Sequence, residues 1–189
     1  KRIVIHVGTY LDENYNYDID KSIEHNIKYL EPFVEKAIEN NIPVSMLKLG
    51  TLYYKEGNTE LSKKYLIRAI ENGCTLAANE LAFIYKKEGN IEFTKKYYSI
   101  SAEKNDLFSI NQLGLIYFEE NNFELSVYYF KIAAEKGYEC GYWNLGKTFE
   151  INNDIETAIS YFKLGFKLNC EYCFDELFEI YLSNKNYEA

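Results

Sequence analysis

The chain has 189 residues, of which 47% are hydrophobic, and a formal net charge of −8 at pH 7. This length and hydrophobic fraction are enough for one well-buried domain. The acidic balance argues against nucleic-acid binding, which calls for a basic face. Because no stretch approaches the roughly 18 apolar residues of a membrane span, we expect no membrane insertion either.

The first 43 residues divide into two parts. Residues 1–18 include an apolar run, Ile3 to Leu11, that suits a short strand, a buried segment or a piece of something upstream, so their structure stays open. Residues 19–43 have apolar side chains at helical spacing, and we expect a degenerate helical unit that Pro32 kinks or restarts. The chain begins with Lys1 and not with methionine, which predicts a trimmed or processed chain and hides any signal peptide.

From residue 44 onward the sequence repeats every 32 residues without insertion. The repeat is marked by Leu49, Leu81, Leu113, Leu145 and Leu177. A small residue follows most of these leucines, and aromatic residues recur four and sixteen positions after them. A fixed period of this size is typical of helical repeat proteins, in which each unit buries its apolar face against its neighbours. Residues 44–189 therefore contain four full units and the first helix of a fifth.

Each unit divides into two runs with helical spacing of apolar residues. We expect first helices at about 44–56, 75–88, 107–120, 139–152 and 171–184. We expect second helices at about 59–72, 91–104, 123–136 and 155–168. Gly or Asn stands in every break between them, as at Gly57 and Asn121, because these residues tolerate the left-handed conformation that ends helices. The small residues at Gly50 and Ala69 and their equivalents are expected where the two helices cross.

Two short motifs carry a family resemblance. The segment from Phe130 to Gly137, followed by Leu145-Gly146, looks like a Sel1-like repeat, with its A-A-E-x-G run and a leucine-glycine pair. The run Leu49-Gly50-x-x-Tyr53 is similar to the tetratricopeptide pattern. Residues 24–189 thus resemble both families. The resemblance implies an all-α fold, a right-handed α-solenoid of stacked antiparallel αα-hairpins, and a non-enzymatic adaptor or scaffold for proteins.

The resemblance also implies where a partner would bind. In these families the first helix of each hairpin lines the concave face, and its positions outside the core contact the ligand. Carried onto this chain, those positions are Leu47, Thr51, Tyr54, Lys55, Asn79, Phe83, Lys86, Lys87, Asn111, Leu115, Phe118, Glu119, Trp143, Lys147, Glu150, Asp175 and Glu179. The alternative for each of them is simple packing against the next first helix.

The charges along this predicted groove are divided. They are basic near Lys86 and Lys87 and acidic near Glu150 and Asp175. The hypothesis is that the groove binds a protein or peptide segment of mixed charge in one orientation. The alternative is an architectural module that self-associates through its open C-terminal end, or packs on a flanking domain, catalytic or not.

The sequence offers little for catalysis. Cys170 and Cys173 form a C-x-x-C motif, which can serve redox chemistry or half of a zinc site. No second such pair exists, both histidines lie far away, and the two cysteines occupy repeat positions that packing explains. We therefore expect no enzyme activity, no metal and no cofactor. Four cysteines are too few for a disulfide scaffold and favour the cytoplasm, which is a host cytoplasm if the source is viral.

Overall fold

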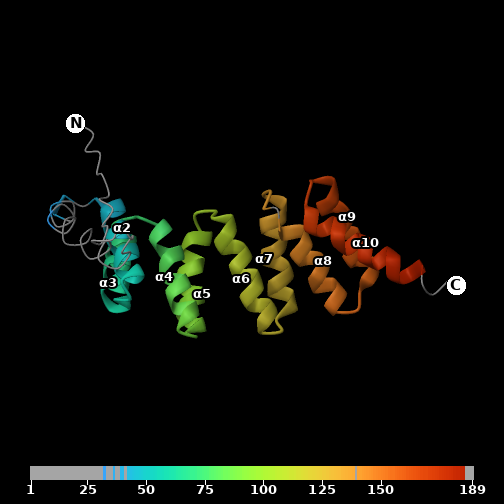
Figure 1. Ribbon diagram of the computed structural model, residues 1–189, viewed down its shortest axis with the longest axis horizontal. Helices are drawn as coiled ribbons and strands as arrows, with labels where there is room; N and C mark the ends of the chain where they lie inside the picture. Colours follow the sequence, from blue (N-terminus) through green and yellow to red (C-terminus); the bar gives the residue numbers. More distant parts are fainter. Residues whose placement is uncertain (1–31, 33–35, 37–38, 41, 139, 186–189) are drawn as a thin grey trace, which may run out of the picture. The chain divides into compact units, whose positions relative to one another are not determined.

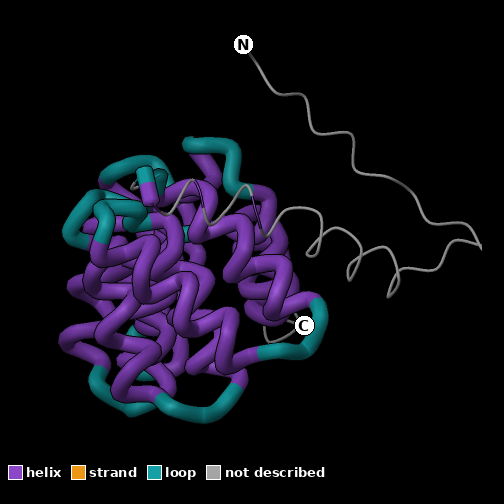
Figure 2. The backbone as a smooth tube through the Cα atoms, turned by 90° about the vertical axis from the view of Figure 1, so that its left-hand side faces the viewer, coloured by secondary structure: helices purple, strands orange, loops and turns teal. Residues whose placement is uncertain are grey.

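The computed structural model describes residues 32, 36, 39–40, 42–138 and 140–185, and these residues form helices and turns without any strand (Figures 1 and 2). The expectations for residues 1–18, and for most of residues 19–43, lie outside the described residues. The described residues fall into two compact units that divide between Tyr97 and Tyr98, and each unit is treated by itself below.

The helices follow the predicted order of hairpins. The bounds are α2 Pro43–Lys55, α3 Thr59–Glu71, α4 Leu76–Lys87, α5 Ile91–Ala102, α6 Leu107–Glu119, α7 Phe123–Glu135, α8 Gly141–Ile151, α9 Ile155–Lys167 and α10 Glu171–Lys185. Each predicted helix is confirmed to within two residues at either end. The largest shifts, of two residues, are at the end of α5 and the start of α8. The late start of α8 follows a turn in which the N–H of Gly141 donates to the carbonyl oxygen of Tyr138 at 2.9 Å. The division between the two units passes through α5.

The breaks between helices have the turn chemistry that the sequence predicted. One residue in each break has a positive φ, which glycine and asparagine adopt at the least steric cost. These residues are Gly57, Gly73, Gly89, Asn105, Asn121, Gly137, Asn153 and Asn169. Most second helices also begin with a side-chain cap. Asn122 Oδ1, for example, accepts from the N–H of Leu125 at 3.2 Å, and Asp154 caps α9 in the same way.

Within a hairpin, a small residue of the first helix lies under a large residue of the second. A Cβ added to Gly114 would lie 2.6 Å from the ring of Phe130, and one added to Gly146 would lie 2.2 Å from the ring of Phe162. Both rings are essentially fully buried. The expected crossing at the small residues is therefore confirmed, because no larger side chain fits beneath these rings.

A stacked pair of aromatic rings ties the two helices of each hairpin near the turn that joins them. Tyr117 stacks on Tyr129 with ring centroids 5.5 Å apart and an angle of 5° between the planes. The same repeat positions give stacks in the other hairpins, namely Tyr53 with Tyr65, Tyr85 with Tyr97 and Phe149 with Tyr161. The recurring aromatics are thus structural.

None of the helices in the described residues is long and apolar enough to cross a membrane.

Candidate functional site

The predicted binding surface consists of the first-helix positions that lie outside the core. Each of the two compact units presents its own part of this surface. In the first unit α2 contacts α4, and in the second unit α8 contacts α10. The predicted residues that are exposed are Lys55, Phe83, Lys87, Glu119, Asp175 and Glu179. Those that are half-buried are Leu47, Thr51, Tyr54, Asn79, Lys86, Leu115, Phe118, Trp143, Lys147 and Glu150.

The first unit combines aromatic rings with lysines, and we call Tyr54, Lys55, Phe83, Lys86 and Lys87 its lysine–aromatic surface. The edge of one ring meets the face of the other between Tyr54 and Phe83, with centroids 6.1 Å apart. The Nζ atom of Lys87 lies 5.5 Å from the centroid of the Phe83 ring. Phe83 is 42% exposed, so its ring is available as an apolar anchor surrounded by positive charge.

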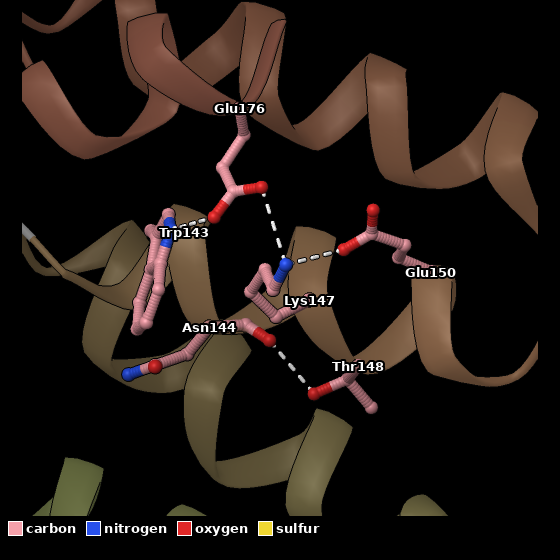
Figure 3. Close-up of polar contacts among 6 residues, drawn as sticks. All are labelled: Trp143, Asn144, Lys147, Thr148, Glu150 and Glu176. Carbon is pink, nitrogen blue, oxygen red and sulfur yellow. Dashed lines mark hydrogen bonds and ion pairs between the residues drawn. The ribbon is translucent and has the colours of Figure 1, made fainter. Parts of the chain in front are cut away.

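In the second unit one carboxylate joins two neighbouring first helices (Figure 3). The indole Nε1 of Trp143 on α8 donates to Glu176 Oε1 on α10 at 3.1 Å. The other oxygen of Glu176 accepts from Lys147 Nζ, also at 3.1 Å, and Lys147 forms a second ion pair with Glu150 at 2.6 Å. We call Trp143, Lys147, Glu150 and Glu176 the tryptophan–acid cluster.

The cluster is electrostatically acidic, because two carboxylates share one ammonium group. Burial alone would lower the pKa of Lys147, but its hydrogen bonds and charge interactions with Glu150 and Glu176 outweigh that effect and raise the pKa. Lys147 is therefore charged at neutral pH, and its ammonium group pairs with both carboxylates. The same helix α10 also carries the exposed carboxylates of Asp175 and Glu179.

Some of the predicted contact residues are used by the fold. Asn111 is only 4% exposed and accepts a hydrogen bond from Asn144 Nδ2 at 2.7 Å. Leu115 packs against a core cluster that contains Phe130, and the hydroxyl of Thr51 donates to the carbonyl oxygen of Leu47 within its own helix at 2.9 Å. These side chains present less to a partner than the sequence suggested.

Sequence reasoning missed Glu176 and Asn144, which make the strongest links between first helices. A signal for them was present: the position directly after the first predicted contact residue of each repeat is polar in all five repeats. The residues at this position are Lys48, Glu80, Gln112, Asn144 and Glu176. At Asn144 and Glu176, which are buried and half-buried, this polar residue forms a hydrogen bond to the first helix of the preceding repeat.

The C-x-x-C motif lies in a packed environment. Cys170 and Cys173 are 2% and 0% exposed and belong to the apolar cluster between α9 and α10. Desolvation by burial, followed by the neighbouring Cys170, raises the pKa of the Cys173 thiol well above its ordinary value, so it is protonated at neutral pH. Among the described residues no three histidine, cysteine or acidic side chains gather as they would around a metal ion. Packing accounts for both cysteines.

The comparisons with known proteins agree with this geometry. The family model of the tetratricopeptide repeat matches residues 44–72 and 141–169, each of which covers one hairpin, α2–α3 and α8–α9. Two hairpins of this chain thus match the tetratricopeptide repeat model. None of the curated proteins matches its sequence.

Solved structures show the same all-α repeat solenoid. The Sel1 repeat protein from Oxalobacter formigenes is 22% identical, with a TM-score of 0.61 over 87% of this chain and 70% of that one. A protective antigen with an SLR fold, from uropathogenic Escherichia coli strains, is 22% identical, with a TM-score of 0.65 over 88% of this chain and 38% of its own. YrrB, described as a TPR protein with an unusual peptide-binding site, is 16% identical, with a TM-score of 0.59 over 82% and 85%.

Proposed function

We propose that this repeat protein is a non-enzymatic scaffold that binds a segment of a partner protein in the groove predicted along its first helices. Repeat proteins of this fold class act mainly by presenting such extended surfaces. The observation that carries the proposal is the tryptophan–acid cluster. Glu176, which is itself paired with Lys147, accepts a hydrogen bond from the Trp143 ring and so holds it in one orientation, and α10 also carries the exposed carboxylates of Asp175 and Glu179. A large ring fixed in place loses little entropy on binding and is a good anchor.

The two units favour opposite charges in their partner. The acidic residues around Trp143 suit a segment with lysine or arginine next to an apolar side chain. The lysine–aromatic surface of the first unit suits a segment with acidic residues next to an apolar side chain, which would pack on Phe83. We therefore propose a partner segment of mixed charge, bound in one orientation, with electrostatics setting specificity more than affinity.

The proposal is tested with a displayed peptide library and with fluorescence, because Trp143 is the only tryptophan of the chain. Peptides selected on the whole chain are titrated against it while the emission of Trp143 is followed. We expect basic peptides to change this emission. The Glu179→Lys variant should bind these peptides about tenfold more weakly. A charge reversal at Glu156, which is exposed on the second helix α9, is the matched control and leaves binding unchanged. Equal loss in both variants, or none in either, contradicts the proposal.

The lysine–aromatic surface is tested in the same way. Acidic peptides from the same selection should lose about tenfold in affinity with Lys87→Glu. Lys64→Glu on the second helix α3, which is also exposed, is the control. Selected peptides that are insensitive to both Lys87→Glu and Glu179→Lys place the function elsewhere on the molecule.

The remaining parts of the functional proposal rest on simpler observations. All four cysteines are free thiols, which supports a reducing compartment such as the cytoplasm. The alternative function, an architectural module that packs on another chain or domain, has its own support in the exposed aromatic residues of α9 and α10.

A further inference from the structure

The chain contains a strongly acidic stretch ahead of its first described helices. Residues 11–20 read Leu-Asp-Glu-Asn-Tyr-Asn-Tyr-Asp-Ile-Asp, with four carboxylates and no lysine or arginine. The two tyrosines stand between two pairs of acids. We call residues 11–20 the acidic–tyrosine segment. It lies outside the described part of the chain.

The acidic–tyrosine segment lacks the residues that the helical stack needs. Thirty-two positions before the buried Leu49 and Gly50 stand Tyr17 and Asp18. At Gly50 the two helices of the hairpin meet so closely that an added Cβ would lie 2.7 Å from the Leu66 side chain. A charged aspartate at such a crossing would be too bulky and would lose its hydration. The repeat pattern therefore does not assign this segment to another first helix of the stack.

The lysine–aromatic surface of the first unit has the complementary chemistry. Lys55 and Lys87 are exposed and form no ion pair with any described residue. Phe83 is 42% exposed between them and offers a ring face to an aromatic partner. The ring of Tyr15 or Tyr17 can pack on Phe83 while the neighbouring carboxylates pair with the lysines. The segment thus has the composition expected of a ligand for this surface, namely acidic residues beside apolar rings.

The connection between the segment and the surface is long enough for binding within one chain. Pro43 begins α2, and Lys55 ends it about 18 Å along the helix axis. The intervening residues 21–42 span about 33 Å even as a continuous helix and about 70 Å when extended. The other part of the surface is on α4, which contacts α2. A ligand tethered in this way has an effective concentration on the order of millimolar, so a modest affinity is enough to occupy the surface.

We propose that the acidic–tyrosine segment binds the lysine–aromatic surface of its own chain and competes there with partner segments. The competition rests on the proposed function, which assigns this surface to acidic segments of a partner. A partner must displace the tethered segment, so its apparent affinity falls by the fraction of chains whose surface is vacant. The segment therefore sets a threshold that a partner must exceed.

The first test links carboxylates directly to amines in the full chain. A carbodiimide condenses a carboxylate with a lysine amine into an amide without a spacer, so it joins groups that are in contact. Mass spectrometry should find acids of residues 11–20 joined to Lys55, Lys86 or Lys87, and not to Lys64, which is exposed on the second helix α3. In an equal mixture of isotope-labelled and unlabelled chains, these products should join peptides of the same label. Products that join the two labels identify a second copy as the occupant and overturn the proposal. So does the absence of products at the three lysines of the surface.

The second test measures occupancy with a fluorescent peptide of residues 11–20. In the neutralised chain, the four acids of the segment become amides through Asp12→Asn, Glu13→Gln, Asp18→Asn and Asp20→Asn. Fluorescence anisotropy should show the peptide binding the neutralised chain at least about tenfold more tightly than the unchanged chain, because the tethered competitor is gone. Adding Lys87→Glu should reverse this gain, whereas adding Lys64→Glu should not.

A matched control removes the effect of net charge. Four exposed glutamates of the second unit are changed to glutamine in a chain that keeps the segment, namely Glu103, Glu124, Glu135 and Glu156. This variant loses as many negative charges as the neutralised chain and should bind the peptide as weakly as the unchanged chain does. Circular dichroism verifies the helical content of each variant. Equal binding by the neutralised chain and this control, or equal effects of Lys87→Glu and Lys64→Glu, overturns the proposal.

The results also separate this inference from the proposed function. Library peptides that depend on Lys87, together with no amide products at the surface, leave the proposed function in place and remove the tethered segment. Amide products at the surface, together with library peptides that ignore Lys87, leave the tethered segment in place and remove the partner assigned to this surface.

Discussion

Asn144 Nδ2 donates to Asn111 Oδ1 at 2.7 Å, and both side chains are buried, at 6% and 4% exposure. The bond connects α8 to α6, the first helices of successive hairpins. One repeat later, Trp143 Nε1 donates to Glu176 and connects α8 to α10 in the same way. In the second unit, side-chain hydrogen bonds therefore tie together the helices that carry the proposed binding surface, and the binding side chains are held in place before a partner arrives.

The first prediction concerns this buried amide pair. Asn144→Ala removes the donor and leaves the amide oxygen of Asn111 buried without it, which should lower the free energy of unfolding by about 1–3 kcal/mol. Urea unfolding followed by the emission of Trp143 measures the change in the unit that contains the pair. The double variant Asn111→Ala, Asn144→Ala should lose less than the sum of the single variants. Additive losses would show that the two amides do not depend on each other.

The fold was predictable because the signals recur in phase. The 32-residue period recurs without insertion. Turn residues such as Asn121 and small residues such as Gly114 each appear in several repeats, so a wrong assignment at one position is corrected by the other repeats. The bounds of α8 shifted because helix starts depend on a single turn, and the sequence there offers no side-chain cap: Cys140 at the N-cap makes no such bond. The hand of the superhelix remains a prediction.

The candidate site was less predictable, because its side chains do not repeat. Trp143 and Lys147 were predicted to lie outside the core of a first helix and are half-buried, but their links to Glu176 depend on which rotamers meet across two helices. The same position holds Asn111 in one 32-residue repeat and Trp143 in the next. Asn111 is buried, whereas Trp143 is half-buried. Periodicity fixes the position of a residue and leaves its contacts undetermined.

The second prediction compares one buried repeat position across four hairpins. Ser62 and Ser126 are fully buried, and their hydroxyls have no hydrogen-bond partner among the described residues. At the same position Thr94 donates to the carbonyl oxygen of Asn90 at 2.8 Å, and Ala158 has no hydroxyl. Ser126→Ala should therefore raise the free energy of unfolding, by up to about 1 kcal/mol, because a buried unpaired polar group is removed.

The matched control for the serine prediction is Ala158→Ser, which introduces a hydroxyl at the same position of the next hairpin. It should lower the free energy of unfolding by about 1–3 kcal/mol. Thermal and urea unfolding of the two variants, beside the unchanged chain, give the two signs. A loss of stability in Ser126→Ala would mean that its hydroxyl is hydrogen-bonded in solution.

The third prediction concerns the asparagine turns. Asn153 has a φ of 61°, and the equivalent residues of earlier hairpins include Gly57 and Gly89. Asn153→Ala should cost about 1 kcal/mol, because a Cβ without a compensating polar group disfavours the left-handed conformation. Asn153→Gly should be neutral or stabilising. The neighbouring Asn152 has a φ of −82°, so Asn152→Ala is the control and should change the melting temperature little. Equal effects of alanine at both positions would contradict the backbone argument.

The last prediction concerns the pH dependence of stability. Burial raises the pKa of the Cys173 thiol above its ordinary value of 9.0. Above pH 9 the unfolded chain therefore releases a proton that the folded chain keeps, and the stability from this group, complete below pH 9, falls as the pH rises. The slope is at most about 1.4 kcal/mol per pH unit for one group.

The slope is best measured between pH 9 and 10. Burial also raises the pKa values of Tyr97 and Tyr129 above their ordinary 10.0, so these tyrosines add the same sign of dependence at higher pH. The variant Cys173→Ala introduces an alanine, which an earlier repeat already has at the same position, Ala77. The variant should start from a lower stability, because the thiol fills space beside Gly165. Its stability should nevertheless fall less steeply over this interval. If urea unfolding gives the same slope for both proteins, the Cys173 thiol ionises as easily in the folded chain as in the unfolded one, and the packing assigned to it is wrong.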